Sequence, residues 1–301
     1  MSFPYVSDLL NWILGTDLRL PIPFFGLLVV LAIVAATYVA RLGVEHQEQL
    51  GRLRAATHAV VPDLALVAAL AGIVGARIFY IADHPGNFVA DPAGMIFSRS
   101  GFSIYGGLLF GVAAGMLFLK RRNIPIVPML DAVAPSLMLG YGIGRLGCQV
   151  AGDGDWGIAA DMSLKPAWLP IWIWAQTYDG NILGVTIQAP GVYPTPLYEF
   201  AAAMLLFGFL WALRSRGSQT GWLFSVYLLL AGFERLLIEK IRINIDHDLF
   251  GHAATQAEAI SMLVIVAGLL GILLTLDARA LWVKVLVSLG VLSALSACAP
   301  W

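Results

Sequence analysis

Charged side chains are scarce in this chain of 301 residues. Asp, Glu, Lys and Arg make up 12% of it, whereas apolar residues make up 59%. Soluble domains carry about 25% charged residues, and they need them to cover their surface. The composition therefore excludes a water-soluble globular protein and a disordered chain, and it predicts a membrane protein. A net charge of −1 gives no support for a nucleic-acid partner.

Cysteine is nearly absent as well, with Cys148 and Cys298 as the two examples. Two cysteines exclude a disulfide framework, and nothing in the sequence gives a reason to pair them. The five histidines lie outside the apolar runs. His247 and His252 are the nearest approach to a metal motif, but no zinc-type spacing is completed. We therefore predict no metal site.

Long apolar runs are what the sequence does have. Crossing about 30 Å of hydrocarbon takes about 20 helical residues, and each run must be helical because lipid offers no partner to backbone polar groups. The pattern predicts an all-α polytopic transmembrane bundle of seven spans, with residues 1–301 as one integral membrane domain. A shorter run at 281–298 would add an eighth span. The seven runs lie at residues 22–40, 60–82, 102–119, 126–147, 196–213, 221–241 and 257–276.

Basic residues in the connections gather on one side of these spans. Lys and Arg remain on the cytoplasmic side. We therefore expect the N-terminus outside, together with the 84–100, 150–195 and 242–255 connections. The basic connections carry Arg41, Arg52, Arg54, Lys120, Arg121, Arg122, Arg214, Arg216, Arg279 and Lys284.

Two segments outside the spans are rich in apolar side chains. The 150–195 connection carries four tryptophans, whose amphipathic rings favour the headgroup level. We expect it to form a small extracytoplasmic head lying on the membrane. Residues 1–20 predict a short interfacial helix. They show no basic region followed by a short apolar core, so we expect the first span to be retained rather than cleaved.

Ionisable residues inside the runs are the informative ones. Each costs roughly 2.5–3.5 kcal/mol at the bilayer centre, so they must face a protein or water-filled interior and pair there. Structural ion pairing is the favoured interpretation for Asp63, Asp131 and Glu234. The full set is Arg77, Arg145, Arg235, Lys240, Asp63, Asp131, Glu199, Glu234 and Glu239.

Two arginines lie near the predicted outer ends of spans. Arg145 is in a glycine-rich stretch at 140–147, where small residues leave space for a headgroup. Arg235, Glu239 and Arg242 recur at i, i+4 and i+7, which predicts one shared helix face. A guanidinium binds phosphate through a planar fork of donors. The residues alone leave two interpretations open, a phosphate grip for a phospholipid and a structural ion-pair network.

Several segments resemble one family. Residues 144–157, GRLGCQVAGDGDWG, are similar to the signature of bacterial prolipoprotein diacylglyceryl transferases, G-R-x-G-N-F-x-N-G-E-x-W-G. An ordered set of segments is more specific than one motif. The further similar segments are 75–80 (GARIFY), 101–107 (GFSIYGG), 193–199 (YPTPLYE), 232–242 (GFERLLIEKIR) and 255–256 (TQ).

The resemblance implies a multi-pass enzyme of the bacterial inner membrane that needs no metal or cofactor. Such an enzyme transfers the diacylglyceryl group of phosphatidylglycerol to the thiol of the lipobox cysteine of a preprolipoprotein and releases glycerol phosphate. Its partners are then phosphatidylglycerol, lipobox-bearing signal peptides and membrane lipid. Residues 295–298, Leu-Ser-Ala-Cys, are themselves similar to a lipobox. Chance is the favoured explanation, because apolar termini readily generate such tetrapeptides.

The resemblance also implies roles for individual residues. Arg145 and Arg235 match the family's essential arginines and are expected to bind phosphate, and Tyr105 is expected to contact the headgroup or relay a proton. Asp153 matches the signature carboxylate, but Asp155 could replace it because the signature here has one extra residue. The carboxylates are expected to orient the arginines. The residues expected to bind substrate are Gly144, Gly147, Asp153, Asp155, Glu199, Glu239, Arg77 and Phe25.

The sequence departs from the family pattern at five positions. Cys148 and Gln149 stand where Asn-Phe is usual, Ala151 where Asn is usual, Phe25 where Tyr is common, and Pro196 where Gln is usual. Losing polar groups at Phe25, Ala151 and Pro196 would alter headgroup recognition. Two alternatives stay open: a related transferase with another donor or acceptor, and a lipid or anion transporter that uses the same arginines.

Overall fold

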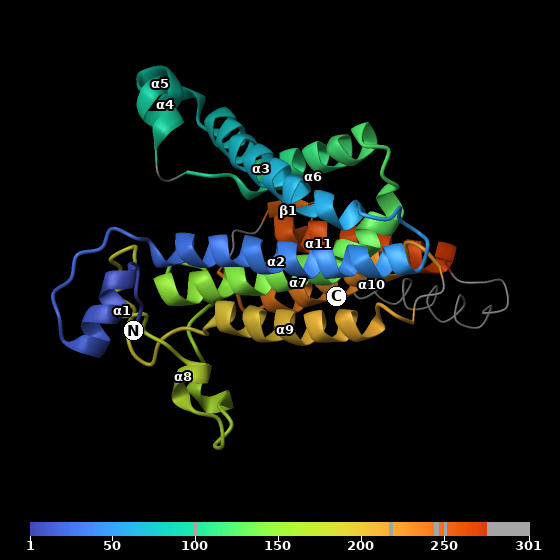
Figure 1. Ribbon diagram of the computed structural model, residues 1–301. Helices are drawn as coiled ribbons and strands as arrows, with labels where there is room; N and C mark the ends of the chain where they lie inside the picture. The colour runs from blue at the N-terminus through green and yellow to red at the C-terminus, as the bar shows by residue number, and fades with distance from the viewer. Residues whose placement is uncertain (99–100, 217–218, 244–246, 250–251, 276–301) are drawn as a thin grey trace. The chain divides into compact units, whose positions relative to one another are not determined.

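The computed structural model describes residues 1–301 except 99–100, 217–218, 244–246, 250–251 and 276–301. Helices dominate it, as predicted (Figure 1). They are α1 (Val6–Leu14), α2 (Phe24–Gln49), α3 (Val61–Asp83), α4 (Pro85–Ala90), α5 (Pro92–Phe97), α6 (Ile104–Arg121), α7 (Ile126–Ala151), α8 (Ile171–Trp174), α9 (Thr195–Leu213), α10 (Trp222–Glu239) and α11 (Gln256–Thr275), with 3-10 turns η1 (Thr57–Val60) and η2 (Met162–Leu164).

One short hairpin departs from the all-α expectation. Strands β1 (His247–Leu249) and β2 (His252–Ala254) pair antiparallel between α10 and α11. This segment falls in the 242–255 connection that the sequence predicts to lie outside the membrane, where water can satisfy backbone groups and a helix is not required.

Each of the seven predicted runs coincides with a helix. Six helical segments are long and apolar enough to cross a membrane, namely α2, η1 with α3, α6, α7, α9 and α11, so this is a multi-pass membrane protein. Helix α10 coincides with the run at 221–241 but carries Glu234, Arg235 and Glu239. The run at 281–298 lies outside the described residues.

The chain divides into two compact units, residues 1–39 with 133–301 and residues 40–132, and each is described by itself. In the 40–132 unit, α3 and α6 pack backbone to backbone. A Cβ added to Gly75 would lie 2.5 Å from the Gly106 carbonyl oxygen, and one added to Gly106 would lie 2.4 Å from that of Gly75. Close approach through small residues is typical of helix packing in membranes.

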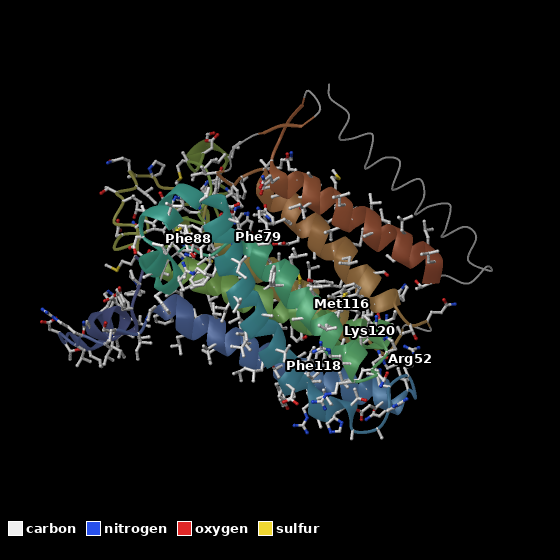
Figure 2. The ribbon with its side chains drawn as sticks, turned by 90° about the horizontal axis from the view of Figure 1, so that it is seen from above. Arg52, Phe79, Phe88, Met116, Phe118 and Lys120 are labelled. Carbon is white, nitrogen blue, oxygen red and sulfur yellow. The ribbon has the colours of Figure 1, made fainter. Side chains whose placement is uncertain are left out.

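Basic side chains gather at one end of the 40–132 unit. Figure 2 shows Arg52 near Lys120, which lies in the last turn of α6. Arg54 and Arg122 line a pocket of about 230 Å³ at the same end. Within this unit, the two connections predicted to be cytoplasmic therefore lie together.

In the other unit, α7 packs against both α2 and α9. A Cβ added to Gly140 would lie 3.4 Å from the Cβ of Ala36 on α2, and one on Gly142 would lie 2.4 Å from the Cε of Met204 on α9. Helix α10 packs on α11 in the same close manner. A buried cluster joins α7, α9, α10 and α11, and it is made of Ala134, Met138, Ala203, Leu210, Leu223, Val226 and Ile272.

The 150–195 segment is mostly irregular and is tied together by isolated bridges. Val192 pairs with both Ala159 and Gln176. The rings of Trp156 and Tyr178 lie 5.1 Å apart, and Tyr178 is fully buried. Hydrogen bonds from the Tyr178 hydroxyl to Gln149 and from the Ile182 N–H to the Ala151 carbonyl oxygen hold the segment against the end of α7.

Candidate functional site

Arg145 lies two turns before the end of α7 and faces two carboxylates. Its Nη1 forms an ion pair with Asp155, and its Nε lies 3.4 Å from Oε2 of Glu199. The guanidinium carbon lies 5.1 Å from the centre of the Tyr141 ring, one turn earlier on the same helix. A cation over an aromatic face is stabilised by the ring quadrupole. Arg145 is therefore fixed on three sides.

Glu199, in the first turns of α9, is the centre of the cluster. Its side chain is fully buried, and a buried carboxylate is costly unless it is paired. Arg145 contacts its Oε2, Arg242 Nη1 lies 3.5 Å from the same oxygen, and Arg235 Nη1 lies 3.9 Å from Oε1. The Tyr141 hydroxyl donates a hydrogen bond of 3.0 Å to Oε1. One carboxylate thus gathers three arginines from separate parts of the chain.

Arg235 and Glu239 pair one turn apart on α10, as their spacing predicts. Arg235 Nη2 lies 2.7 Å from Glu239 Oε2, and the Glu239 side chain is 1% exposed. The Thr255 hydroxyl donates a 2.5 Å hydrogen bond to the other oxygen of Glu239. Glu239 thus holds the Nη2 side of the Arg235 guanidinium group, while Nη1 faces Glu199.

The prediction that Arg242 shares a helix face with Arg235 is wrong. Helix α10 ends at Glu239, so helical spacing no longer applies at residue 242. Arg242 instead forms a β-bridge with Gly157, and its Nη2 lies 2.7 Å from Asp155 Oδ1. A Cβ at Gly157 would lie 2.3 Å from the Ile241 carbonyl oxygen, so only glycine allows this approach.

Asp155, rather than Asp153, contacts the arginines. Its two oxygens are shared between Arg145 and Arg242, while Asp153 Oδ1 accepts a 3.3 Å hydrogen bond from the Asp155 backbone N–H. Burial opposes ionisation of Asp155, but the guanidinium groups of Arg242 and then Arg145 outweigh it and hold the pKa of Asp155 below its ordinary value. Asp155 is therefore a carboxylate at neutral pH.

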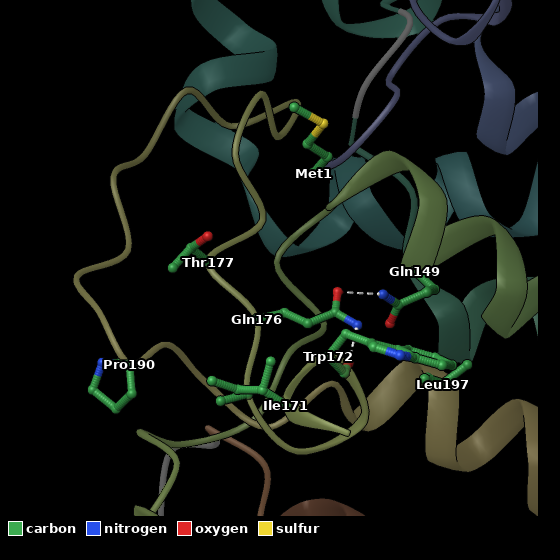
Figure 3. Close-up of a pocket in the computed structure, with 9 residues that line it drawn as sticks. Met1, Gln149, Ile171, Trp172, Gln176, Thr177, Pro190 and Leu197 are labelled. Carbon is green, nitrogen blue, oxygen red and sulfur yellow. Dashed lines mark hydrogen bonds between the residues drawn. The ribbon is translucent and has the colours of Figure 1, made fainter. Parts of the chain in front are cut away.

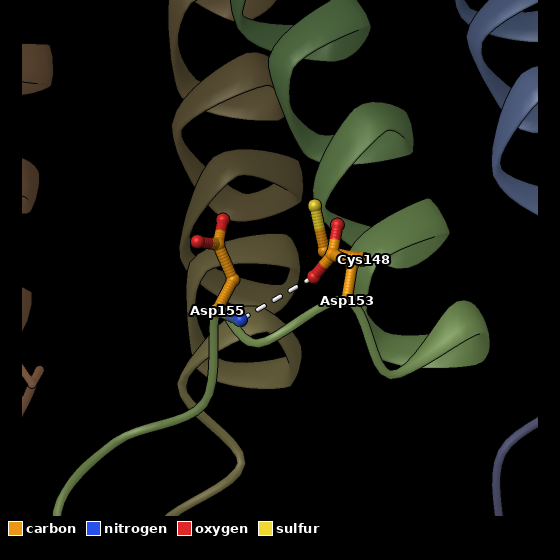
Figure 4. Close-up of side chains that lie close together, drawn as sticks. All are labelled: Cys148, Asp153 and Asp155. Atoms are coloured by element: carbon orange, nitrogen blue, oxygen red, sulfur yellow. Dashed lines mark hydrogen bonds between the residues drawn. The ribbon is translucent and has the colours of Figure 1, made fainter. Parts of the chain in front are cut away.

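Among the described residues, one group resembles a metal-binding set, namely Cys148, Asp153 and Asp155 (Figure 4). Their potential ligand atoms all lie within 4.8 Å of one another. Two guanidinium groups already pair with Asp155, and their positive charge opposes a cation at this position. The cluster suits an anion better than a metal ion.

Donors remain available in the arginine cluster. Arg235 Nη1 and Arg242 Nε are buried and have no hydrogen-bond acceptor among the described residues. Leaving a buried charged donor unsatisfied costs free energy. A phosphate group has several acceptor oxygens and would satisfy such donors through charge-assisted hydrogen bonds. The arrangement can therefore hold a phosphoryl group among Arg145, Arg235 and Arg242.

The remaining predicted residues lie in two places. Gly147 packs on Phe25, whose ring would lie 3.1 Å from an added Cβ, whereas a Cβ at Gly144 would meet no heavy atom within 4 Å. Tyr105 and Arg77 belong to the separately described 40–132 unit. Tyr105 is 47% exposed there, and Arg77 donates to the carbonyl oxygens of Met95 and Ser98.

Sequence reasoning missed Tyr141, and it named Arg242 and Thr255 without predicting their contacts in this cluster. Tyr141 precedes Arg145 by one helical turn, a spacing that could have been noticed. Arg242 and Thr255 reach the cluster through contacts between distant segments, for which the sequence has no local signal.

Residues 14–274 match the protein family described as prolipoprotein diacylglyceryl transferase. The chain belongs to this family. The family assignment covers α2 to α11 and every residue of the arginine cluster.

Three relatives illustrate the similarity, and each is named phosphatidylglycerol–prolipoprotein diacylglyceryl transferase. The protein from Leptospira interrogans (strain Fiocruz L1-130) is 33% identical over 206 residues, 60% of this chain and 61% of the relative. That from Synechococcus elongatus is 30% identical over 260 residues, 84% of this chain and 83% of the relative. That from Corynebacterium efficiens is 31% identical over 250 residues, 80% and 73% of the two chains. The matched region thus spans less than two thirds of the Leptospira protein.

Proposed function

We propose that this protein transfers the diacylglyceryl group of phosphatidylglycerol to the lipobox cysteine thiol of a preprolipoprotein and releases glycerol phosphate. The observation that carries the proposal is the meeting of Arg145 and Arg235 at the two oxygens of Glu199, beside buried guanidinium N–H groups without acceptors. Membership of the family and the names of the relatives support the same reaction.

In this proposal the donor phosphate lies among Arg145, Arg235 and Arg242. Asp155, Glu199 and Glu239 hold the guanidinium groups in place before the lipid arrives. Preorganised donors in a water-poor site stabilise developing charge without reorganising during the reaction. The carboxylates are thus positioning residues, and the arginines are the catalytic ones.

The chemical step is a displacement at carbon. The acceptor sulfur attacks the glycerol carbon that bears the phosphate oxygen, a C–S bond forms, and the C–O bond breaks. Both electrons of that bond remain on the departing glycerol phosphate, whose growing negative charge the arginines stabilise. The thiol proton must leave, because the thiolate is the nucleophile. Tyr105 is proposed to contact the headgroup or relay this proton.

Further residues are proposed to contact the substrate. Gly144, with open space beside it, and Gly147, against Phe25, leave room for the headgroup along α7. Asp153 and Arg77 complete the proposed substrate-binding set. Because both reactants are held in the membrane, positioning supplies much of the remaining acceleration.

We also propose the membrane arrangement. Helix α10 is the sixth of seven spans, with its charged residues turned toward the arginine cluster, and 281–298 is the candidate for an eighth. The N-terminus and the 150–195 head lie outside the bacterial inner membrane. Trp12, Ile13 and Leu14 on α1 are each about 60% exposed, which supports an interfacial position for residues 1–20.

Reconstituted protein tests the reaction directly. Supplied with phosphatidylglycerol and a lipobox peptide, it is expected to form the diacylglyceryl thioether peptide, detected by its mass, with one glycerol phosphate released per product. It should also rescue a bacterial strain depleted of its own diacylglyceryl transferase. Movement of the lipid headgroup across vesicles without any thioether product would show a transporter instead.

A further inference from the structure

A second site adjoins the arginine cluster. A pocket of about 540 Å³ opens between the end of α7, the start of α9 and the 171–177 segment (Figure 3). Gln149 follows Arg145 by one turn of α7, and Leu197 precedes Glu199 by two residues on α9. The pocket and the arginine cluster therefore draw residues from the same two helices. Its lining residues are Met1, Gln149, Ile171, Trp172, Ala175, Gln176, Thr177, Pro190 and Leu197.

The pocket lining contains no charged side chain. No Lys, Arg or His side chain of the lining would pair with a phosphate group, whereas the adjoining cluster offers three guanidinium groups. The arginine cluster one turn away is the better place for it. The pocket chemistry therefore fits a neutral group with both apolar and hydrogen-bonding parts.

A chain of hydrogen bonds fixes two amides at the pocket wall. The Tyr178 hydroxyl donates to Gln149 Oε1 at 2.8 Å, and Gln149 Nε2 donates to Gln176 Oε1 at 2.8 Å. Gln176 Nε2 donates to the Trp172 carbonyl oxygen at 2.7 Å. Because the last acceptor is a backbone carbonyl, the direction of every bond in the chain is determined.

The two amides are held in place, yet each has an N–H group that makes no hydrogen bond among the described residues. Gln176 exchanges two backbone hydrogen bonds of 3.0 Å with Val192, and Tyr178 is fully buried. Each glutamine nitrogen makes one hydrogen bond among the described residues, which leaves a second N–H on each. A ligand would thus meet preorganised donors beside the exposed apolar side chains of Ile171 and Trp172.

We propose that this pocket binds the main chain of the acceptor peptide next to its reactive cysteine, with the Gln149–Gln176 amide pair donating to peptide carbonyl oxygens. The inference rests on the proposed transferase function and adds the acceptor subsite to it. Peptide groups are neutral acceptors and donors, and apolar side chains on the same peptide fit the remaining walls. Gln149 stands where the family signature has Phe, so the amide pair is a feature of this chain.

Steady-state kinetics with two varied substrates tests the subsite. Gln176→Met keeps the side-chain length and removes both amide functions, and Gln149→Phe restores the family residue. Each is expected to raise KM for a lipobox peptide about 5-fold or more, because a hydrogen bond contributes about 1 kcal/mol. The KM for phosphatidylglycerol and kcat should remain within about 2-fold of wild type. Gln188→Met changes an exposed glutamine of the same segment outside the pocket and should change neither KM.

Crosslinking gives a second readout that does not depend on these variants folding well. A lipobox peptide with a photoreactive side chain beside its cysteine should crosslink to residues 171–177 of the wild-type protein, as mapped by mass spectrometry. Unchanged peptide KM in both variants, or crosslinks elsewhere, would overturn the proposal while thioether formation still supports the transferase. A rise in KM for the lipid alone would assign the pocket to the donor and likewise overturn it.

Discussion

Arg145 and Arg235 contact different oxygens of the same carboxylate, that of Glu199, at 3.4 and 3.9 Å. The two arginines come from α7 and α10, and Glu199 comes from α9. The two arginines therefore meet at a carboxylate that a third helix supplies. A fully buried anion between two cations fixes their separation before any ligand binds. We regard this geometry as the basis of the proposed phosphate site.

Removing the charge of Glu199 should destabilise the protein. Glu199→Gln keeps the side-chain shape but leaves three guanidinium groups beside a neutral amide. Breaking a buried ion pair in this way costs about 3–5 kcal/mol. Thermal unfolding in detergent should show a large fall in Tm. Glu45→Gln removes an exposed partner of Arg41 and should cost less than about 0.5 kcal/mol, and equal losses in the two variants would contradict the role of Glu199.

Gly157→Ala should displace Arg242 without removing any charged group. The new Cβ would lie 2.3 Å from the Ile241 carbonyl oxygen, so the 241–242 backbone must move. We expect a loss of about 1–3 kcal/mol and a fall in transferase activity. In Gly208→Ala on α9, the new Cβ meets nothing within 4 Å, and stability should rise by up to about 1 kcal/mol. Full activity in the Gly157 variant would show that the Arg242 position is unimportant.

The depressed pKa of Asp155 predicts an acid-dependent loss of stability. Its folded-state pKa lies below the unfolded value of about 3.9, so its contribution is present above that pH and is lost as the pH falls through the folded pKa. Asp155→Asn should therefore lower Tm most at pH 7, and the difference from wild type should shrink below about pH 4. The control Asp17→Asn changes an exposed aspartate and should alter Tm little at pH 7. A constant Tm difference for Asp155→Asn across this range would contradict the prediction.

Labelling of single cysteines tests the proposed topology. In a background without Cys148 and Cys298, Ser163→Cys and Ile243→Cys should react with an impermeant maleimide added outside spheroplasts. Arg216→Cys should react after permeabilisation. These three exposed positions flank α9 and α10. Labelling of Ile243 on the same side as Arg216 would show that α10 does not cross.

Local patterns in the sequence were sufficient to predict the membrane-spanning helices and one ion pair. Continuous apolar runs permit only helix in lipid, and all seven runs are helical. Arg235 and Glu239 are four residues apart within one helix, so their contact follows from helical geometry.

Contacts between distant segments could not be predicted in the same way. The i+7 spacing placed Arg242 on a helix that had already ended, and its real partner Gly157 is far away in the sequence. The choice of Asp155 over Asp153 depends on which carboxylate meets both arginines. The pairing of Gln149 with Gln176 depends on how the 150–195 segment folds back on α7. Each requires the assembled fold.

The most direct test of the shared phosphate site is a double-mutant cycle on Arg145 and Arg235. Arg145→Gln and Arg235→Gln should each lower kcat/KM for phosphatidylglycerol about 100- to 1,000-fold, since each removes a charged donor to the leaving phosphate. If both bind one phosphate, the double variant should lose much less than the product of the two factors, with a coupling of at least about 1 kcal/mol. Exposed Arg216→Gln should leave kcat/KM unchanged. Near wild-type activity in either single variant, or losses that simply multiply, would contradict a site shared by the two arginines.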